Sequence, residues 1–259
     1  GDEKLAELPR GVPVGIVAAP GMFAPEDAPS ASWSVCGADR ITVVAGEAPE
    51  PLPIDAAVLA ADASREWVVT AEGRRLLPEA NTPQGRVIRR ALGINPDTPR
   101  WTPPTQVISA LRELPPAALP DPLPQVLDAD DASWALSDDR IQPITATQRT
   151  MLLDAGAKSA VAARESLAAY PDAEEELRLP GERPRWVEPH LACVDQGRGG
   201  ATVAEVPEGI ALSGTSVATH FAGLHGGSVG VDSGHGFHVV SANGLRHRAP
   251  DAETLATVG

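Results

Sequence analysis

Lysine and long apolar runs are scarce in this chain. Its lysines are Lys4 and Lys158, and no cluster of basic residues offsets a formal net charge of -14. A partner with a phosphate backbone or an anionic membrane surface is therefore not expected, because both attract concentrated positive charge. No apolar stretch approaches the roughly 18 residues that span a bilayer, and residues 1–4 do not begin a signal peptide. We expect either a protein that is soluble throughout or the soluble part of a larger one.

The sequence also lacks the motifs that most often hold a nucleotide or a metal ion. A phosphate-binding P-loop places a lysine after a glycine, and neither lysine follows one, which leaves residues 226–230 as an isolated glycine-rich stretch. All six histidines lie between His190 and His247, without H-E-x-x-H or paired C-x-x-C spacing. Exposed histidines on glycine-rich loops are the simpler interpretation, so we predict no cofactor and no metal site. The residues that could come together as metal ligands are His220, His225, Asp232, His235 and His238.

Three short boxes near the C-terminus resemble those of subtilisin-like serine proteases, with Ser216, His225 and Asp232 as the three side chains. A catalytic triad gathers these groups from separate elements of a scaffold. Here they lie in one short window, in the reverse of that family's order, and small residues in tight turns explain the pattern better. No catalytic residue is predicted. The acidic run Glu174–Glu176 is likewise predicted to be a solvated helix face rather than a metal site.

The chain has two cysteines, Cys36 and Cys193, and each lies in a stretch typical of a buried strand. Ser32–Cys36 alternates small polar with large apolar residues at the two-residue period of a pleated sheet, and Leu191–Val194 is an apolar run. A bond between the sulfurs would close a loop of about 157 residues and contribute roughly 5 kcal/mol in the chain-entropy model. Two separate buried thiols fit the same residues, since free cysteine behaves as a small hydrophobe. Spacing alone leaves both alternatives open.

One sequence pattern occurs three times. A bulky residue, two apolar residues, a hydroxyl and a turn follow one another in Trp67–Arg74, Trp134–Ile141 and His238–Leu245. Each copy predicts two strands joined by a tight turn, and Asn243-Gly244 is the strongest hairpin signal in the chain. In the second copy Arg140 stands where the turn glycine would be, which puts the geometry of that hairpin in question.

A short helix with recognisable ends is predicted after each copy. In the middle helix, Gln148 lies three residues after a threonine, which makes a capping box. In the first, Pro83 suits the first-turn position. The repeating unit is therefore strand, turn, strand and helix, and it must pack against neighbours to bury its faces. The predicted first and last positions are Thr82 and Gly93, Thr145 and Gly156, and Pro250 and Gly259.

The segments between the repeats differ in composition. Residues 96–124 are dense in proline and predict a semi-rigid spacer, pinned by one helix over 105–114. Residues 160–177 predict a helix up to Pro171, whereas 193–236 predict short strands and loops. A further strand is predicted over 14–17. The predicted organisation is a central domain in two parts, 1–60 and, with a connector, 161–236; repeat domains at 61–95, 125–160 and 237–259; and the spacer at 96–124.

Taken together, these features resemble the EccB family, a core component of the type VII (ESX) secretion machinery of actinobacteria. The order and spacing of several stretches carry the resemblance, which covers nearly the whole chain. These stretches are Leu8-Pro9 with Val14–Ile16, Trp33–Cys36, Trp67–Thr70 with Gly73-Arg74, the proline-rich segment with its helix, Cys193, and Gly244-Leu245 with Pro250–Thr254.

The resemblance implies a fold and a location. Family members have a short cytoplasmic N-terminus, one transmembrane helix and a large domain on the outer side of the inner membrane. We therefore expect an α+β, β-rich and elongated molecule, with a central β body closed by one disulfide and small peripheral strand-turn-strand-helix repeat domains. Cys36 and Cys193 match the family's disulfide pair, and an oxidising compartment favours that bond. The membrane helix, the family's first repeat domain and the stretch after residue 259 are expected to lie outside this chain.

The resemblance also implies partners and a role. The partners are other type VII core components, namely EccC, EccD, EccE and the mycosin protease, together with further copies of the protein. The leading hypothesis is a non-catalytic extracytoplasmic scaffold that self-associates and helps to assemble the complex. ATP hydrolysis is an alternative, because some family members are called ATPases, although no P-loop is present. Binding of cell-wall glycan is another, but Trp67, Trp134 and Tyr170 supply few aromatic rings for sugar stacking.

Overall fold

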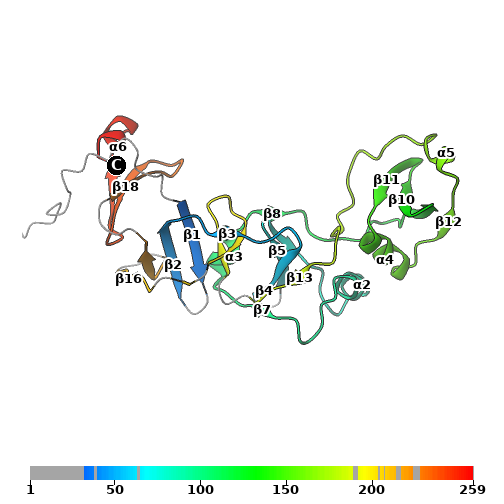
Figure 1. Cartoon of the computed structure of the whole chain (residues 1–259), viewed down its shortest axis with the longest axis horizontal. Helices are drawn as coiled ribbons and strands as arrows, with labels where there is room; N and C mark the ends of the chain where they lie inside the picture. Colours follow the sequence, from blue (N-terminus) through cyan, green and yellow to red (C-terminus); the bar gives the residue numbers. More distant parts are fainter. Residues whose placement is uncertain are drawn as a thin grey trace, which may run out of the picture. The chain divides into compact units, whose positions relative to one another are not determined.

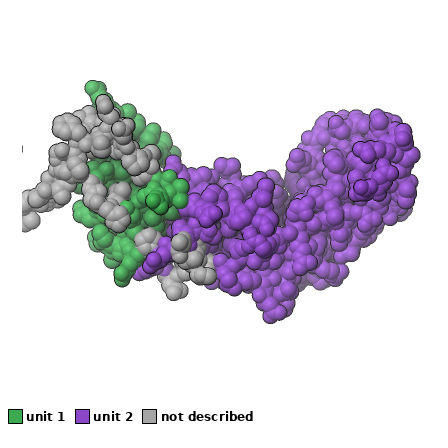
Figure 2. Space-filling model, in the orientation of Figure 1, with its two compact units in different colours: residues 1–34, 42–48, 207–259 green, residues 35–41, 49–206 purple. Residues whose placement is uncertain are grey.

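The computed structural model describes residues 32–37, 40–62, 65–188, 192–203, 205–206, 208–213, 217–223 and 228–258. The chain forms two compact units, coloured separately in Figure 2: one of residues 1–34, 42–48 and 207–259, the other of residues 35–41 and 49–206. Strands outnumber helices in both units, which confirms the β-rich α+β class. The strand predicted over 14–17 lies outside the described residues.

Both cysteines belong to the larger unit. Strand β1 (Ser32–Gly37) pairs antiparallel with β14 (Ala192–Val194) through Val35 and Cys36. On its other side β14 pairs with β15 (Gly200–Thr202), which in turn pairs with β3 (Glu50–Pro51). The strand predicted at each cysteine is therefore present, and segments far apart in the sequence lie side by side.

The first repeat begins with an antiparallel meander in the same unit. Its strands are β4 (Ala56–Asp62), β5 (Arg65–Thr70) and β6 (Gly73–Leu76), followed by helix α2 (Pro83–Ala91). The chain then adds β7 (Arg100–Trp101) parallel to β4, crosses as α3 (Thr105–Ala110), and adds β8 (Glu113–Leu114) parallel to β6. A later strand, β13 (Arg185–Trp186), also pairs parallel with β4.

The middle repeat has the same order of elements. Its meander is β9 (Gln125–Ala129), β10 (Ala132–Ser137) and β11 (Arg140–Ile144), followed by α4 (Ala146–Asp154). Then β12 (Ser159–Val161) pairs parallel with β9, α5 (Arg164–Leu167) follows, and Asp172 makes a parallel bridge to Ile141. Figure 1 shows α4, β10, β11, β12 and α5 gathered in one group.

Two of the predicted helices are too long. The one predicted over 105–114 ends at Ala110, because Leu111 is extended and the backbone N–H of Arg112 donates to the carbonyl of Arg198 at 2.7 Å. The one predicted from residue 160 to Pro171 is replaced by β12 and the single turn of α5. Backbone hydrogen bonds to β9 outweigh the helix propensity of the alanines there.

Turn and cap residues fix the local structure of the repeats. Gly73 has a φ of 144° at the first hairpin, whereas the middle hairpin uses two positive-φ residues, Asp138 at 50° and Asp139 at 58°. Aspartate tolerates this conformation, so the hairpin closes although Arg140 lies where a glycine was expected. The Thr82 side chain caps α2, and Thr145 with Gln148 forms the predicted capping box of α4.

The two repeats share one hydrophobic core, in which α2 and α4 are in contact. Ile88 of α2 and Met151 of α4 are both completely buried in it, next to Leu59 and Val126 of the two first strands. A second, smaller core lies on the other face of the middle sheet, where Leu167 of α5 packs with residues of β9 and β11. Each helix thus supplies the apolar stripe that its sheet needs.

The smaller unit contains the third repeat. Strand β2 (Ile41–Gly46) pairs parallel with β17 (His220–Ala222), and β17 pairs antiparallel with β16 (Ile210–Ala211). The third meander is β18 (Ser228–Asp232), β19 (Phe237–Ser241) and β20 (Arg246–Ala249), followed by α6 (Ala252–Val258). The short strands predicted over 193–236 are confirmed where that stretch is described. Among the described residues, no helix has the length and apolar character needed to cross a membrane.

Candidate functional site

A disulfide bond joins Cys36 and Cys193 in the larger unit. The two residues are direct partners in the pairing of β1 with β14, and their Cα atoms are 4.2 Å apart. Their residual exposures are 1% and 0%, so the bond is closed off from solvent. A buried cystine is inert toward dissolved thiols because exchange requires access to a sulfur.

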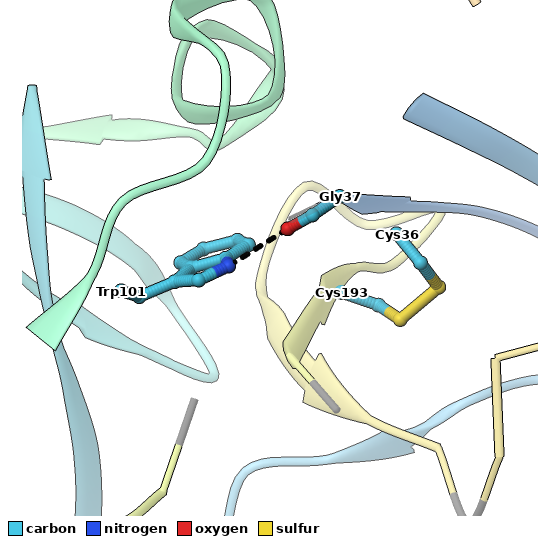
Figure 3. Close-up of a disulfide and its surroundings, with 4 residues drawn as sticks. All are labelled: Cys36, Gly37, Trp101 and Cys193. Atoms are coloured by element: carbon cyan, nitrogen blue, oxygen red, sulfur yellow. Dashed lines mark hydrogen bonds between the residues drawn. A yellow bond between two sulfur atoms is a disulfide. The ribbon is translucent and has the colours of Figure 1, made fainter. Parts of the chain in front are cut away.

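The indole of Trp101 ties the first repeat to the strand that carries the disulfide. Its Nε1–H donates to the backbone carbonyl of Gly37, next to Cys36, at 2.9 Å (Figure 3). The ring is 3% exposed, so this hydrogen bond satisfies a donor that would otherwise be buried without a partner. A Cβ on Gly37 would lie 2.8 Å from a methyl carbon of Val107 in α3. Only glycine therefore allows α3 to approach this strand so closely.

The loop between β14 and β15 holds the other end of α3. Arg198 donates from Nε to the carbonyl of Ala110 at 2.9 Å and from Nη2 to that of Leu111 at 3.3 Å. Its own carbonyl accepts the N–H of Arg112. An arginine at a helix C-terminus satisfies carbonyls that the helix leaves unpaired and complements its dipole. Arg198 does this with a φ of 68°, a conformation that non-glycine residues rarely adopt.

These contacts make a structural centre. The cystine, Trp101 and Arg198 connect β1, β14 and β15 to β7 and α3 of the first repeat. Every polar group named here has a partner, and the sulfurs are buried. Such an arrangement resists relative movement of its parts.

Some of the candidate chemical residues that the sequence singled out lie in the described part of the chain. Ser216, His225 and the glycine-rich residues 226–227 lie outside the described residues, whereas Asp232 is exposed at the end of β18. Within the described ranges, no group of three or more His, Cys, Asp or Glu side chains is arranged to hold a metal ion. His220 and His238 lie on different strands, β17 and β19.

The acidic run Glu174–Glu176 is exposed but is not helical, so the prediction of a helix face there is wrong. The run lies beside β11, where Glu174 forms an ion pair with Arg140 at 2.7 Å. The carbonyl of Glu175 accepts a hydrogen bond from the side chain of Gln142 at 3.2 Å. Backbone hydrogen bonds tie Pro171 and Ala173, just before the run, to Ile141, and Glu174 and Glu175 lie in a bend.

The aromatic side chains considered above for stacking on sugars pack against other residues of the fold. Trp67 is 3% exposed, and the guanidinium groups of Arg65 and Arg74 lie 5.0 and 5.8 Å from its ring centroid. Trp134 and Tyr170 both pack against the smaller core of the middle repeat. Their rings serve as packing surfaces, which is the usual role of aromatic residues at such positions.

Sequence reasoning missed Trp101, Gly37 and Arg198. The hydrogen bond from Trp101 spans 64 positions, and that from Arg198 to Ala110 spans 88. Contacts between residues so far apart in the sequence cannot be predicted from a local pattern. A usable signal was present in the sequence: Trp101 is one of five tryptophans in a chain with 3% aromatic residues, and a tryptophan within a proline-rich stretch is out of place in a solvated spacer.

Comparison with known proteins agrees with this architecture. Two similar solved structures are those of the periplasmic assembly from the ESX-5 inner membrane complex and of an intact ESX-5 inner membrane complex, each matched by a chain 18% identical to this one. The TM-scores are 0.66 and 0.68, and 99% of this chain is covered in both cases. The matches span 77% and 65% of those chains. At this identity the likeness establishes the fold.

No curated protein sequence matches the chain. A family model does: residues 1–255 match the family described as "Type VII secretion system ESX-1, transport TM domain B". The match includes both cysteines and all three copies of the sequence pattern, and so covers the features that carried the resemblance in the sequence. This protein therefore belongs to the EccB family of the type VII secretion system.

Proposed function

We propose that this chain is a non-catalytic scaffold of the type VII secretion membrane complex. In this proposal it acts on the extracytoplasmic side, associates with further copies of itself, and helps to assemble the other core components. The observation that carries the proposal is the bracing of the first repeat around the buried cystine by Trp101 and Arg198. A binding subunit benefits from such pre-organisation, because fewer degrees of freedom are lost when partners associate.

The disulfide supports an extracytoplasmic location. Disulfides persist in oxidising compartments and are rare in the cytosol of most organisms. Both complete repeats lie between Cys36 and Cys193 in the sequence, so this one covalent bond closes a loop that contains most of the larger unit. A protein stabilised in this way is suited to the outer side of an inner membrane.

The domain boundaries proposed for the repeats are 56–114 and 125–172. Each of these ranges contains a meander, a helix, a strand parallel to the first strand, a short helix and a final parallel pairing to the third strand. They differ from the predicted 61–95 and 125–160 because the spacer and the connector join the edges of the two sheets. Limited proteolysis would test them: cuts should fall between residues 115 and 124, and early cuts inside 96–114 would contradict the longer first repeat.

The function is tested by purifying the full-length, membrane-anchored protein from its own host in mild detergent and measuring what accompanies it. Recovery of other type VII membrane components in constant ratio is the expected result. A matched pair of variants sharpens the test. Trp101→Ala should reduce co-purification by loosening the centre, whereas Trp134→Ala, at a half-buried ring away from it, should change the ratio less.

Recovery of the protein without other subunits would overturn the scaffold proposal. The same preparation serves to test ATP hydrolysis, the alternative activity. Hydrolysis that stays proportional to the protein through successive columns would argue for an enzyme. Activity that is lost on further purification would be contamination and would leave the scaffold as the better account.

A further inference from the structure

Both cysteine-bearing strands are held by the same part of the first repeat. We call residues 101–112, which run from β7 through α3, the bridging segment. At its start, Trp101 donates to the carbonyl of Gly37, in the strand of the first cysteine (Figure 3). At its end, the backbone N–H of Arg112 donates at 2.7 Å to the carbonyl of Arg198, in the loop that follows β14. Two strands that are far apart in the sequence therefore have a common partner.

The bridging segment has partners of its own within the first repeat. Trp101 pairs with Ala60 of β4, and the carbonyl of Arg112 accepts the backbone N–H of Arg74 in β6 at 2.8 Å. These contacts do not involve the cysteine strands. They join residues that are close in the sequence, so their loop-closure entropy is small. The first repeat can therefore present the bridging segment in a chain whose cysteines are still thiols.

The loop between β14 and β15 meets the first repeat at several points. Besides the bonds of Arg198 to the end of α3, the carbonyl of Gly197 accepts a hydrogen bond from the Arg112 side chain at 3.2 Å. A Cβ added to Gly199 would lie 1.9 Å from the carbonyl oxygen of Ala71, at the turn between β5 and β6. Only glycine allows the two backbones to approach so closely. The loop thus contacts the first repeat along its backbone as well as through Arg198.

Bonds between near neighbours also fix the shape of this loop. The side chain of Asp195 accepts the N–H of Gly199 at 2.8 Å, and its backbone carbonyl accepts the N–H of Arg198 at 3.0 Å. Such bonds do not depend on the cystine. A loop that is already ordered loses little further conformational freedom when it docks.

Direct pairing of the two cysteine strands is slight by comparison. Among the described residues, the register of β1 with β14 joins Val35 to Val194 and Cys36 to Cys193. The two cysteines are 157 positions apart, and bringing them together costs loop-closure entropy. A ladder as short as this one offsets little of that cost, because even a whole isolated hairpin is only marginally stable. The contacts of both strands with the first repeat supply the remaining stabilisation.

We propose that the first repeat is an internal template for the disulfide bond. The bridging segment holds β1 through Trp101 and the β14–β15 loop through Arg198 while the cysteines are thiols, so the two sulfurs lie side by side before they are joined. Trp101 and Arg198 are thus positioning residues for the oxidation of Cys36 and Cys193. The proposal concerns how the bond arises, and it stands or falls separately from the scaffold function.

The oxidation requires an oxidant that carries a disulfide, such as a thiol–disulfide oxidoreductase. The thiolate of one cysteine attacks a sulfur of this disulfide, which forms a mixed disulfide and releases one oxidant thiolate. The thiolate of the other cysteine attacks the protein sulfur of the mixed disulfide, which forms the Cys36–Cys193 bond and releases the second oxidant thiolate. The two protons lost by the cysteines pass to these thiolates, so two protein thiols are oxidised and one disulfide is reduced.

The template acts on the second of these steps. The cysteines of the finished bond are 1% and 0% exposed, so the oxidant must react before both strands are fully docked. The second step is intramolecular, and its rate depends on how closely the remaining thiolate is held to the mixed disulfide. Loss of a positioning residue should therefore slow closure of the bond.

The first test follows bond formation in the full-length protein in its own host. After an isotopic pulse, samples are quenched with acid, free thiols are blocked with a maleimide, and mass spectrometry quantifies the linked Cys36 and Cys193 peptides. The positioning variants are Trp101→Ala and Arg198→Gly, since glycine suits the φ of 68° at that position.

Two matched controls lie in the middle repeat, inside the same covalent ring. Leu127→Ala truncates a buried side chain of the smaller core, and Arg149→Ala removes an arginine that donates from Nε and Nη2 to Asp128. The positioning variants should form the bond at least fivefold more slowly than the wild type, with free thiols or mixed disulfides accumulating, and the controls should stay within twofold. Unchanged rates in the positioning variants, or equal slowing in the controls, would overturn the proposal.

The second test asks whether the strands dock without the bond. In full-length Cys193→Ser protein purified in mild detergent, the Cys36 thiol should react with a maleimide at least tenfold more slowly than in denatured protein. Adding Arg198→Gly should accelerate the reaction at least fivefold, whereas adding Arg149→Ala should not. Labelling of the Cys193→Ser protein as fast as in the denatured state would show that docking needs the bond, and the template proposal would fail.

Discussion

The first and middle repeats differ at the short strand that is added beside the first strand of the meander, β7 in the first repeat and β12 in the middle one. Trp101 pairs with Ala60 in the first repeat, whereas Ala160 pairs with Leu127 in the middle one. A large residue of the added strand thus lies beside a small residue of the meander in the first repeat, and the sizes are exchanged in the middle one. Close packing is conserved by such an exchange, because only the total volume has to match. The tryptophan in the first repeat is long enough to reach the cystine strand, and the alanine is not.

Because of this difference, the first repeat is anchored to the strand that carries Cys36, whereas the middle repeat is not. The first repeat is held at the centre by Trp101, Arg198 and the close approach at Gly37. The middle repeat is held to it through the shared core and an ion pair of 3.4 Å between Arg90 and Asp154. Disturbing the centre should therefore affect the first repeat directly and the middle repeat only through their common core.

Removing the disulfide is expected to have the largest effect. Replacing Cys36 and Cys193 by serine should lower the free energy of unfolding by roughly 5 kcal/mol, because the unfolded chain regains the entropy of a long open loop. Guanidinium unfolding of the variant and the wild type measures this. Hydrogen exchange should accelerate in β7 and α3 before β12. Equal acceleration in both repeats would contradict the comparison.

Replacing the anchoring side chain of Trp101 should have the second-largest effect on stability. Trp101→Ala removes a buried ring and leaves the Gly37 carbonyl without its donor, so a loss of about 3–5 kcal/mol is expected. Trp134→Ala is the matched change in the middle repeat and should cost clearly less, because that ring is half-buried. Thermal unfolding of both variants gives the two numbers. If Trp134→Ala lowered the free energy of unfolding as much as Trp101→Ala, the contacts around the cystine would not anchor the first repeat more firmly than ordinary packing does.

The helix caps allow a finer comparison of the repeats. Thr145→Ala removes a capping box and a hydrogen bond to the carbonyl of Gly181, whereas Thr82→Ala removes a cap and a bond of 2.8 Å to the carbonyl of Glu79. Each change should cost about 0.5–2 kcal/mol, with Thr145 toward the upper end. Urea unfolding of the two single variants decides the order, and serine at either position serves as the control.

The smallest effect is expected in the acid stability of the middle repeat. Hydrogen bonds from Arg149 and then Ser133 lower the pKa of Asp128 from 3.8 to about 2. A carboxylate with a depressed pKa stabilises the fold fully above its unfolded value and loses this contribution as the pH falls toward 2. The unfolding free energy of the wild type should therefore drop more steeply between pH 4 and about 2 than that of Asp128→Asn. Parallel slopes would show that the ion pair is too exposed to matter.

Local features of this fold could be predicted from the sequence because they depend on neighbouring residues. The caps at Thr82 and Thr145 and the strands at Cys36 and Trp67 follow from patterns a few residues long. The structure of residues 100–114 and 159–172 could not be predicted, because their prolines and alanines favour spacer and helix, while pairing with distant strands decides their structure. The anchoring contacts of Trp101 and Arg198 could not be predicted for the same reason.

The candidate site was predictable only in part. The pairing of Cys36 with Cys193 remained open from spacing and followed from the family resemblance.

The cystine also determines whether cleavage of the chain by a protease releases a fragment. Every peptide bond between residues 37 and 192 lies inside the covalent ring that it closes. A single cut in that stretch, for example in the proline-rich segment after residue 114, leaves both fragments linked. Release of a fragment requires a second cut or a reductant, so damage to one exposed loop within the ring does not by itself detach the first or the middle repeat from the rest of the chain.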